Sequence, residues 1–192
     1  EMGKPISQSI AEVEKCAWVC EYYAKNAEEH LQKQYIETEA KKSYVRFDPL
    51  GVILAIMPWN YPFWQVFRFA APALMAGNVG VLKHAGNVIL SAENIQAAFL
   101  EAGFPEGCFQ NLIMNHKKTE HSIRHKRIKA VTLTGSESAG KTVAAIAGSE
   151  IKKTVLELGG SNALVVFEDA DIEKTVQTCV QARFQNTGQS CI

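Results

Sequence analysis

The run Leu50-Gly51-Val52-Ile53-Leu54-Ala55-Ile56-Met57 is almost entirely apolar, as is typical of a strand buried on both faces of a parallel sheet. It ends at Pro58-Trp59-Asn60-Tyr61-Pro62, where two closely spaced prolines cannot continue a strand ladder. A helix is predicted next, over residues 67–75. Ligands bind where parallel strands end, so Trp59 and Asn60 are candidates for ligand contact, although a proline-rich turn with a packing tryptophan would explain the same residues.

Predicted strands and helices alternate on both sides of this run. The strands cover 79–83, 109–114, 128–134, 152–158 and 162–167, and 35–47 is predicted to be extended; the helices cover about 7–31, 67–75, 91–102 and about 170–184. Ser7 or Ser9, Ser91, and Asp169 or Asp171 are the predicted caps of the first, third and last helices. This alternation predicts an α/β fold with a mostly parallel sheet.

Composition excludes several classes of function. The 192 residues are 47% hydrophobic and 21% charged, with 20 basic and 20 acidic side chains, so no net field favours nucleic acid or an anionic membrane. The basic stretch 117–129 is interpreted as a solvated face. No apolar run approaches a membrane span. Five cysteines without framework spacing predict free thiols and no metal site, and a cytoplasmic protein is expected.

One motif suggests a different function. Residues 135–142, Gly-Ser-Glu-Ser-Ala-Gly-Lys-Thr, match the phosphate-loop pattern G-x-x-x-x-G-K-[ST] and follow an apolar strand. A nucleotidase is therefore an alternative. Glu137 argues against it, because a carboxylate inside a loop that wraps polyphosphate is costly. Backbone amides at this helix start would bind a diphosphate under either interpretation.

Two reactive side chains occur near backbone-permissive residues. Glu157 ends a predicted buried strand before Gly159-Gly160, and Cys191 follows Asn186-Thr187-Gly188-Gln189-Ser190. A thiolate that attacks a carbonyl and a carboxylate that moves protons are what covalent catalysis requires. Each residue alone has an ordinary explanation, a free thiol and a glutamate paired with a lysine. The function prediction therefore depends on the whole set.

That set, in its order and spacing, resembles the NAD(P)-dependent aldehyde dehydrogenase superfamily. The matching segments are Pro58-Trp59-Asn60, Leu82-Lys83, Thr134-Gly135-Ser136, Leu156 to Gly160, and Phe184 to Cys191. The resemblance implies a Rossmann-like cofactor domain over residues 1–158 and the beginning of a second α/β catalytic domain over 159–192. It also explains the phosphate-loop match, which falls inside one of the family segments.

The resemblance implies a role for each matching residue. Cys191 would be the nucleophile, Asn60 with the Cys191 amide would stabilise the oxyanion, and Glu157 would activate the water that releases the acid. NAD or NADP is the implied cofactor. Its expected contacts are Trp59, Lys83, His84, Ala85 and Gly86 at the ribose, Gly135 and Ser136 at the diphosphate, and Leu158 at the nicotinamide.

The surrounding residues look most like the succinate-semialdehyde dehydrogenase branch. Arg68 matches an arginine that this branch uses for the substrate carboxylate, whereas Gln185 stands where a second arginine is expected. Gly86 replaces a glutamate that many NAD-preferring members carry, and its loss removes repulsion against a 2′-phosphate, which favours NADP or dual use.

The family is considerably longer than this chain at both ends. We therefore expect a piece of a longer enzyme, which is a homo-oligomer when complete and inactive as an isolated fragment. Two alternatives remain, a dinucleotide-binding remnant without turnover and the phosphate-loop nucleotidase.

Overall fold

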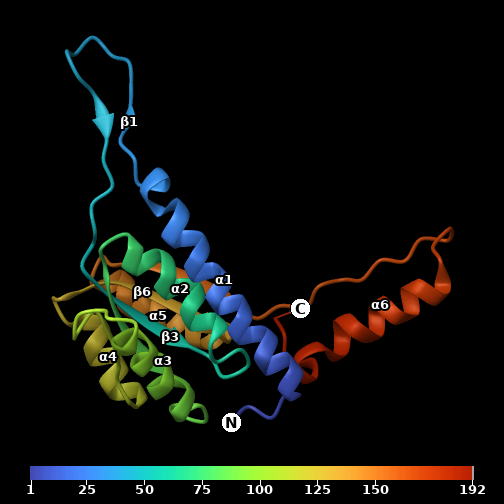
Figure 1. Ribbon diagram of the computed structural model, residues 1–192. Helices are drawn as coiled ribbons and strands as arrows, with labels where there is room; N and C mark the ends of the chain where they lie inside the picture. The colour runs from blue at the N-terminus through green and yellow to red at the C-terminus, as the bar shows by residue number, and fades with distance from the viewer. Residues whose placement is uncertain (192) are drawn as a thin grey trace.

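Five parallel strands form the centre of the protein, with helices on both faces (Figure 1). The computed structural model describes residues 1–191. The strand order is β5-β4-β3-β6-β7, and the strands span Phe109–Asn111 (β5), Val79–His84 (β4), Val52–Met57 (β3), Ile128–Gly135 (β6) and Lys153–Leu158 (β7). All four pairings are parallel, so the predicted α/β fold with a parallel sheet is confirmed.

β3 lies at the centre and is buried on both faces, as its apolar run predicts. Successive side chains of a strand point to opposite faces. Leu54 packs into one hydrophobic cluster, whereas Ala55 and Met57 pack into the other. Leu54 and Ala55 are completely buried, which explains why polar residues do not alternate along this strand.

The helices divide between the two faces of the sheet. The cluster around Ala55 includes residues of α2 (Trp64–Met75) and α3 (Ile89–Glu101), and the cluster around Leu54 includes residues of α4 (His116–Arg124) and α5 (Glu137–Ser149). β3 is thus followed by a helix on one face, and its neighbour β6 by a helix on the other. This reversal is the topological switch point at which open α/β sheets bind ligands.

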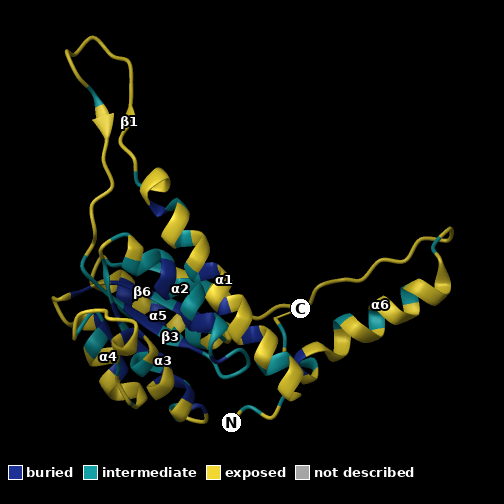
Figure 2. Cartoon of the chain, viewed as in Figure 1, coloured by how far each residue is buried: buried dark blue, intermediate teal, exposed yellow. Residues whose placement is uncertain are grey.

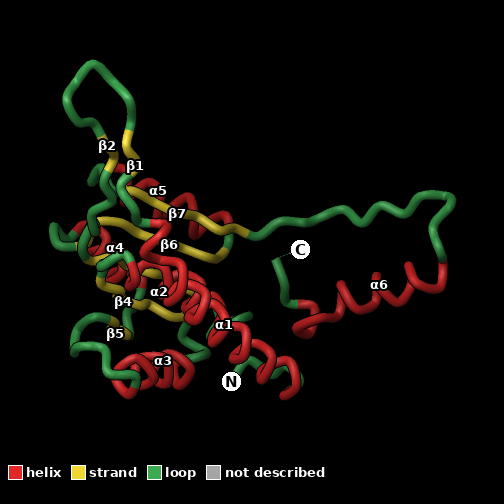
Figure 3. Tube along the Cα trace, turned by 45° about the horizontal axis from the view of Figure 1, so that its top comes forward, coloured by secondary structure: helices red, strands yellow, loops and turns green. Residues whose placement is uncertain are grey.

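A long helix and a protruding hairpin precede the sheet. α1 (Ile6–His30) packs across α2, and β1 (Gln34–Tyr35) pairs antiparallel with β2 (Tyr44–Val45) in an arm that projects from the body (Figures 1 and 3). Within residues 1–191, no helix has both the length and the apolar character that crossing a bilayer requires.

Residues after β7 leave the body of the protein. The segment 159–171 runs outward and α6 (Ile172–Phe184) returns, both largely exposed (Figure 2). The predicted strand over 162–167 is wrong, because Leu164 to Phe167 contact no neighbouring strand and are 46–73% exposed. The chain does leave the sheet at Leu158, but the assignment of 159–192 to a second domain stays a prediction.

Helix boundaries differ from prediction at several places. α1 begins after Pro5, without a side-chain cap from Ser7 or Ser9, and Ser91 lies inside α3. α4 was not predicted at all, because its sequence buries only Thr119 and Ile123 and is otherwise charged or polar. The Asp171 cap of α6 is confirmed, since its side chain accepts from the Lys174 amide at 3.1 Å.

His84 joins the end of β4 to the turn after β3. Its Nε2 lies 2.8 Å from the Pro62 carbonyl oxygen, and its Nδ1 lies 3.2 Å from the Met57 carbonyl oxygen and 2.9 Å from the Ala85 amide nitrogen. Burial lowers the pKa of His84, since a charged ring loses its hydration. The neutral imidazole therefore fixes the turn that carries Asn60.

This burial predicts a pH dependence of stability. Because the folded pKa lies below the unfolded value of about 6.5, the contribution of His84 is fully present above that pH and is lost as the pH falls through it toward the folded pKa. Denaturant unfolding at pH 7.5 and 5.5 should show a smaller acid loss for His84→Gln than for the unsubstituted protein. Equal losses would contradict the assignment.

Candidate active site

The predicted site residues gather at one edge of the sheet. Parallel strands end together, and the register pairs Met57 with His84 and Gly135 with Leu158. The segments that follow β3, β4, β6 and β7 therefore lie side by side at the switch point. This edge carries the predicted residues Trp59, Asn60, Lys83, His84, Ala85, Gly86, Gly135, Ser136, Glu157 and Leu158.

Cys191 reaches the same edge through a strained turn. After α6, Asn186 (φ 54°) and Thr187 (φ 55°) adopt left-handed conformations and Gly188 follows at φ 72°. Such a conformation is uncommon outside glycine, above all for a β-branched residue, and costs about 1–3 kcal/mol per residue. Strain of this kind persists where surrounding contacts determine the structure.

Asn186 provides those contacts. Its buried side-chain amide donates to the carbonyls of Asn60 (2.8 Å) and Gln189 (3.0 Å), and Asn60 Nδ2 also donates to the Gln189 carbonyl (2.8 Å). The segment before Cys191 is thus bonded directly to the turn after β3. An amide nitrogen carries two hydrogens, so Asn60 keeps one N–H for another acceptor.

Cys191 lines a pocket of about 460 Å³ together with Glu157, the predicted base, whereas Asn60 lies outside its lining. Glu157, Arg68 and Leu158 line it, together with Gln185, which replaces the expected second arginine. Tyr61 also lines it, and its hydroxyl lies 3.1 Å from that of Ser190. Thiol and carboxylate therefore face the same space, as covalent catalysis on a carbonyl requires.

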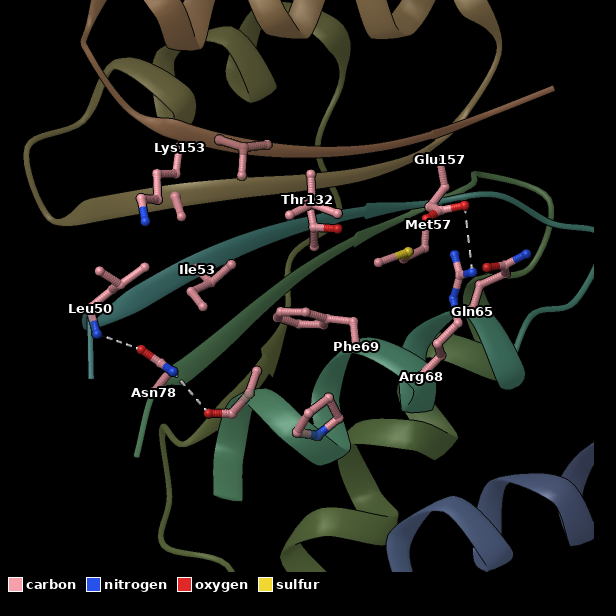
Figure 4. A pocket seen from close by; sticks show the side chains of 15 residues that line it. Leu50, Ile53, Met57, Gln65, Arg68, Phe69, Asn78, Thr132, Lys153 and Glu157 are labelled. Carbon is pink, nitrogen blue, oxygen red and sulfur yellow. Dashed lines mark hydrogen bonds and ion pairs between the residues drawn. The ribbon is translucent and has the colours of Figure 1, made fainter. Parts of the chain in front are cut away.

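Arg68 connects this pocket to a neighbouring one. Its Nη1 lies 3.8 Å from Glu157 Oε2, and its Nη2 donates to Thr134 Oγ1 at 3.1 Å. Figure 4 shows Arg68 extending from α2 toward Glu157 on β7, beside a pocket of about 470 Å³ over the uncovered face of β6 and β7. Both side chains are partly exposed, so the pair is weakly coupled and can exchange for another anion.

A second cation lines the pocket of Cys191. Lys15 of α1 holds its ammonium 4.0 Å from the centre of the Trp64 ring, a cation–π contact that leaves its charge without a carboxylate partner among the ion pairs of residues 1–191. Glu12 and Glu157 also line the pocket, but Glu12 is paired with Lys4 and Glu157 with Arg68. Lys15 therefore offers the charge that is available to an anionic ligand. Lys15 was not predicted as a site residue, because the apolar spacing of α1 indicated a packing helix.

The residues predicted to contact the cofactor differ in their exposure to solvent. His84 is buried, so it offers no free ring nitrogen to a ligand, whereas Gly86 and Ser136 are exposed. A Cβ added at Gly86 meets nothing within 4 Å. Burial lowers the pKa of Lys83, and a desolvated ammonium is stabilised by an anionic partner. These features fit a phosphate-bearing ligand; the individual contacts remain predictions.

The phosphate-loop alternative does not fit this geometry. β6 ends at Gly135 and α5 begins at Glu137, so no loop remains to surround a polyphosphate. Lys141 is exposed and pairs with Glu137 at 2.6 Å. Gly140 is needed for packing, because a Cβ there would lie 2.6 Å from Leu158 Cδ2. The Ser136 side chain caps the helix by accepting from the Ala139 amide.

Comparison with known proteins identifies the family of this chain. A model of the Aldehyde dehydrogenase family matches residues 1–192. The chain belongs to the aldehyde dehydrogenase family. The predicted family is therefore confirmed, and the matches below confirm its succinate-semialdehyde dehydrogenase branch.

Two curated relatives of this aldehyde dehydrogenase chain are both named as NADP(+)-dependent succinate-semialdehyde dehydrogenases. It is 58% identical over 192 residues to a probable succinate-semialdehyde dehydrogenase [NADP(+)] of Synechocystis, and 54% identical over 195 residues to a succinate-semialdehyde dehydrogenase [NADP(+)] of Mycobacterium avium. All of the chain is covered in both comparisons, against 42% and 41% of the relatives. The chain thus spans about two fifths of their length.

A solved structure agrees with the fold. The succinic semialdehyde dehydrogenase of Streptococcus pyogenes, in complex with NADP+ as the cofactor, superposes with a TM-score of 0.96 at 39% identity. The match covers 99% of this chain and 42% of that one. The sheet, the helices and the outlying α6 segment therefore correspond to one continuous part of a larger aldehyde dehydrogenase structure.

Proposed function

We propose that the whole protein oxidises succinate semialdehyde, or a related small aldehyde with a carboxylate, to the acid with NADP+ or NAD+. The observation that carries this proposal is the pocket where Cys191, Glu157 and Arg68 meet. The names of the relatives support the substrate and cofactor. A dinucleotide-binding protein without turnover is the alternative.

In the proposed reaction, the Cys191 thiolate attacks the aldehyde carbon and forms a C–S bond. The carbonyl oxygen becomes an oxyanion, stabilised by the free Asn60 N–H and the Cys191 amide. The bound nicotinamide supplies a hydride acceptor. When the hydride leaves the carbon, the carbonyl forms again as a thioester on Cys191.

Glu157 acts in the second half of the reaction. It takes a proton from water as the oxygen attacks the thioester carbon, the C–S bond breaks, and the acid and the thiolate separate. Arg68 and Lys15 would bind the distal carboxylate of the substrate. When Arg68 binds that carboxylate, its contact with Glu157 weakens and the base is released to move.

Substrate charge gives the first test of this proposal. Succinate semialdehyde and butanal have the same carbon chain, so reduced nicotinamide formed with each of them in the whole protein measures the preference for the carboxylate. Arg68→Met should reduce kcat/KM for succinate semialdehyde by roughly 10-fold or more, with a much smaller effect on butanal. Equal losses of kcat/KM for the two aldehydes would exclude carboxylate recognition by Arg68. If the unsubstituted protein reduces neither NADP+ nor NAD+, the dinucleotide-binding protein without turnover is the remaining alternative.

Gly86 gives a test of the cofactor. A glutamate fits there because a Cβ meets nothing within 4 Å, and its charge would repel a 2′-phosphate. Gly86→Glu should raise KM for NADP+ by about 10-fold and leave KM for NAD+ nearly unchanged. Gly86→Gln is the uncharged control. If both variants raise KM for NADP+ equally, charge repulsion is not the cause.

We also propose a cytoplasmic homo-oligomer. Support for association comes from the β1–β2 arm, which exposes Tyr35, Ile36, Tyr44, Val45 and Phe47 outside the body (Figure 2). The mass of the whole protein in solution, measured by light scattering, decides between one chain and several.

A further inference from the structure

The N-terminal part of α1 presents a row of polar side chains to the active site. Lys4, Gln8 and Glu12 are spaced four residues apart, so they lie on one side of the helix and of the turn that precedes it. Lys4 and Glu12 form an ion pair whose side chains are 4% and 3% exposed. Burial of two charges on an otherwise amphipathic helix requires a reason other than packing.

Glu12 binds the beginning of α2. Its Oε1 accepts from the amides of Phe63 and Trp64, both at 2.8 Å. The first amides of a helix have no partners within it, and the helix dipole favours a negative charge there. No residue of α2's own cap supplies a side-chain hydrogen bond. Glu12 therefore caps α2 from another helix and fixes the end of the turn that carries Asn60.

Gln8 binds the segment that carries the thiol. Its Oε1 accepts from the backbone N–H of Asn186 at 2.8 Å. Asn186 is the first left-handed residue of the turn before Cys191. Lys4 adds a link between the two sides, since its ammonium lies 4.6 Å from the centre of the Tyr61 ring, whose hydroxyl contacts Ser190. One side of α1 thus contacts both halves of the reactive centre.

We propose that Lys4, Gln8 and Glu12 are positioning residues that set the placement of Asn60 relative to Cys191. This inference rests on the proposed function for its catalytic consequence, but not for its structural one. Glu12 acts through the α2 start and Asn60, and Gln8 acts through Asn186. A displacement of about 1 Å at a reacting centre can cost roughly 100-fold in rate.

Hydrogen exchange in the whole protein tests the structural part without any substrate. In Glu12→Ala and Gln8→Ala, amide exchange at residues 60–64 and 186–191 should accelerate at least about 10-fold, while β3 and β6 keep their protection. Glu14→Ala, an exposed position on the same helix, is the matched control. Unchanged exchange in both segments would overturn the proposal, and accelerated exchange throughout the sheet would assign these residues to global stability instead.

Kinetics tests the catalytic part. Glu12→Ala should lower kcat by about 100-fold and leave KM for the cofactor unchanged. Lys4→Met with Glu12→Gln removes both charges yet keeps an acceptor for the two amides, so it should recover most of kcat. A double variant as slow as Glu12→Ala would overturn the capping role. If the unsubstituted protein oxidises no aldehyde, the proposed function fails, and hydrogen exchange alone decides the positioning role.

Discussion

Cys191→Ser should abolish aldehyde-dependent formation of reduced nicotinamide, with a fall in kcat of roughly 10⁵-fold or more. The serine hydroxyl has almost the same size, but it is far less acidic than a thiol and is a much weaker nucleophile at neutral pH. Cofactor binding, followed by fluorescence titration, should persist. Cys108→Ser, at a half-buried thiol outside the pocket, is the control that should keep full activity.

Alkylation tests the nucleophilic role of Cys191 without a substitution. Cys191 is exposed, whereas Cys16 is buried, and burial raises the pKa of the Cys16 thiol to about 12. Iodoacetamide should therefore modify Cys191 long before Cys16, with loss of activity in parallel. If activity survives full modification of Cys191, as read by peptide mass, the thiol is not the nucleophile.

Glu157→Gln should slow the second half of the reaction only. Loss of a general base costs about 10²–10⁴-fold, and the hydride has already been transferred when Glu157 is needed. Rapid mixing with excess aldehyde and cofactor should therefore show a burst of one reduced nicotinamide per active site, followed by a slow phase. The thioester on Cys191 should accumulate and be visible by mass after acid quench.

Glu106→Gln is the control for this substitution, because Glu106 is exposed and lies outside both pockets. Its progress curve should match that of the unsubstituted protein. A Glu157→Gln protein that loses the burst together with the steady rate would move Glu157 to the attack step, as the base that activates the thiol.

Local sequence predicted the sheet well and its surroundings less well. The strands β3, β4 and β6 were predicted because their apolar runs are buried whatever their neighbours are. β7 was predicted from a similar run, but its predicted burial is wrong, since its residues are half-buried or exposed and Val155 is 60% exposed. The run Leu164 to Phe167 has the same composition, yet it lies exposed outside the sheet, because a strand needs a partner that apolar character alone does not identify. α4 was missed for the opposite reason, since Thr119 and Ile123, although four residues apart, are its only buried residues and are too few to reveal a helical pattern.

The placement of Asn60 and Glu157 was predictable because both lie at strand ends, and Cys191, which follows α6, was predictable only from its family segment. Asn60, Glu157 and Cys191 belong to segments with family resemblance. Gln8, Glu12 and Lys15 lie on a helix whose apolar spacing explained its presence, and their partners are distant in sequence. The four-residue spacing of Lys4, Gln8 and Glu12, with opposite charges at its two ends, was the signal available for Gln8 and Glu12 but not for Lys15.

The contacts that assemble the reactive centre join residues that are far apart in the sequence. Gln8 and Asn186 are 178 positions apart, and Asn60 and Gln189 are 129 apart. Closing such long loops costs more entropy than forming neighbouring strands and helices. During folding the parallel sheet can therefore form while thiol and amide are still separated. Under the proposed function, the reactive centre is complete only after α1 docks against the turn that precedes Cys191, so an incompletely folded chain would lack it.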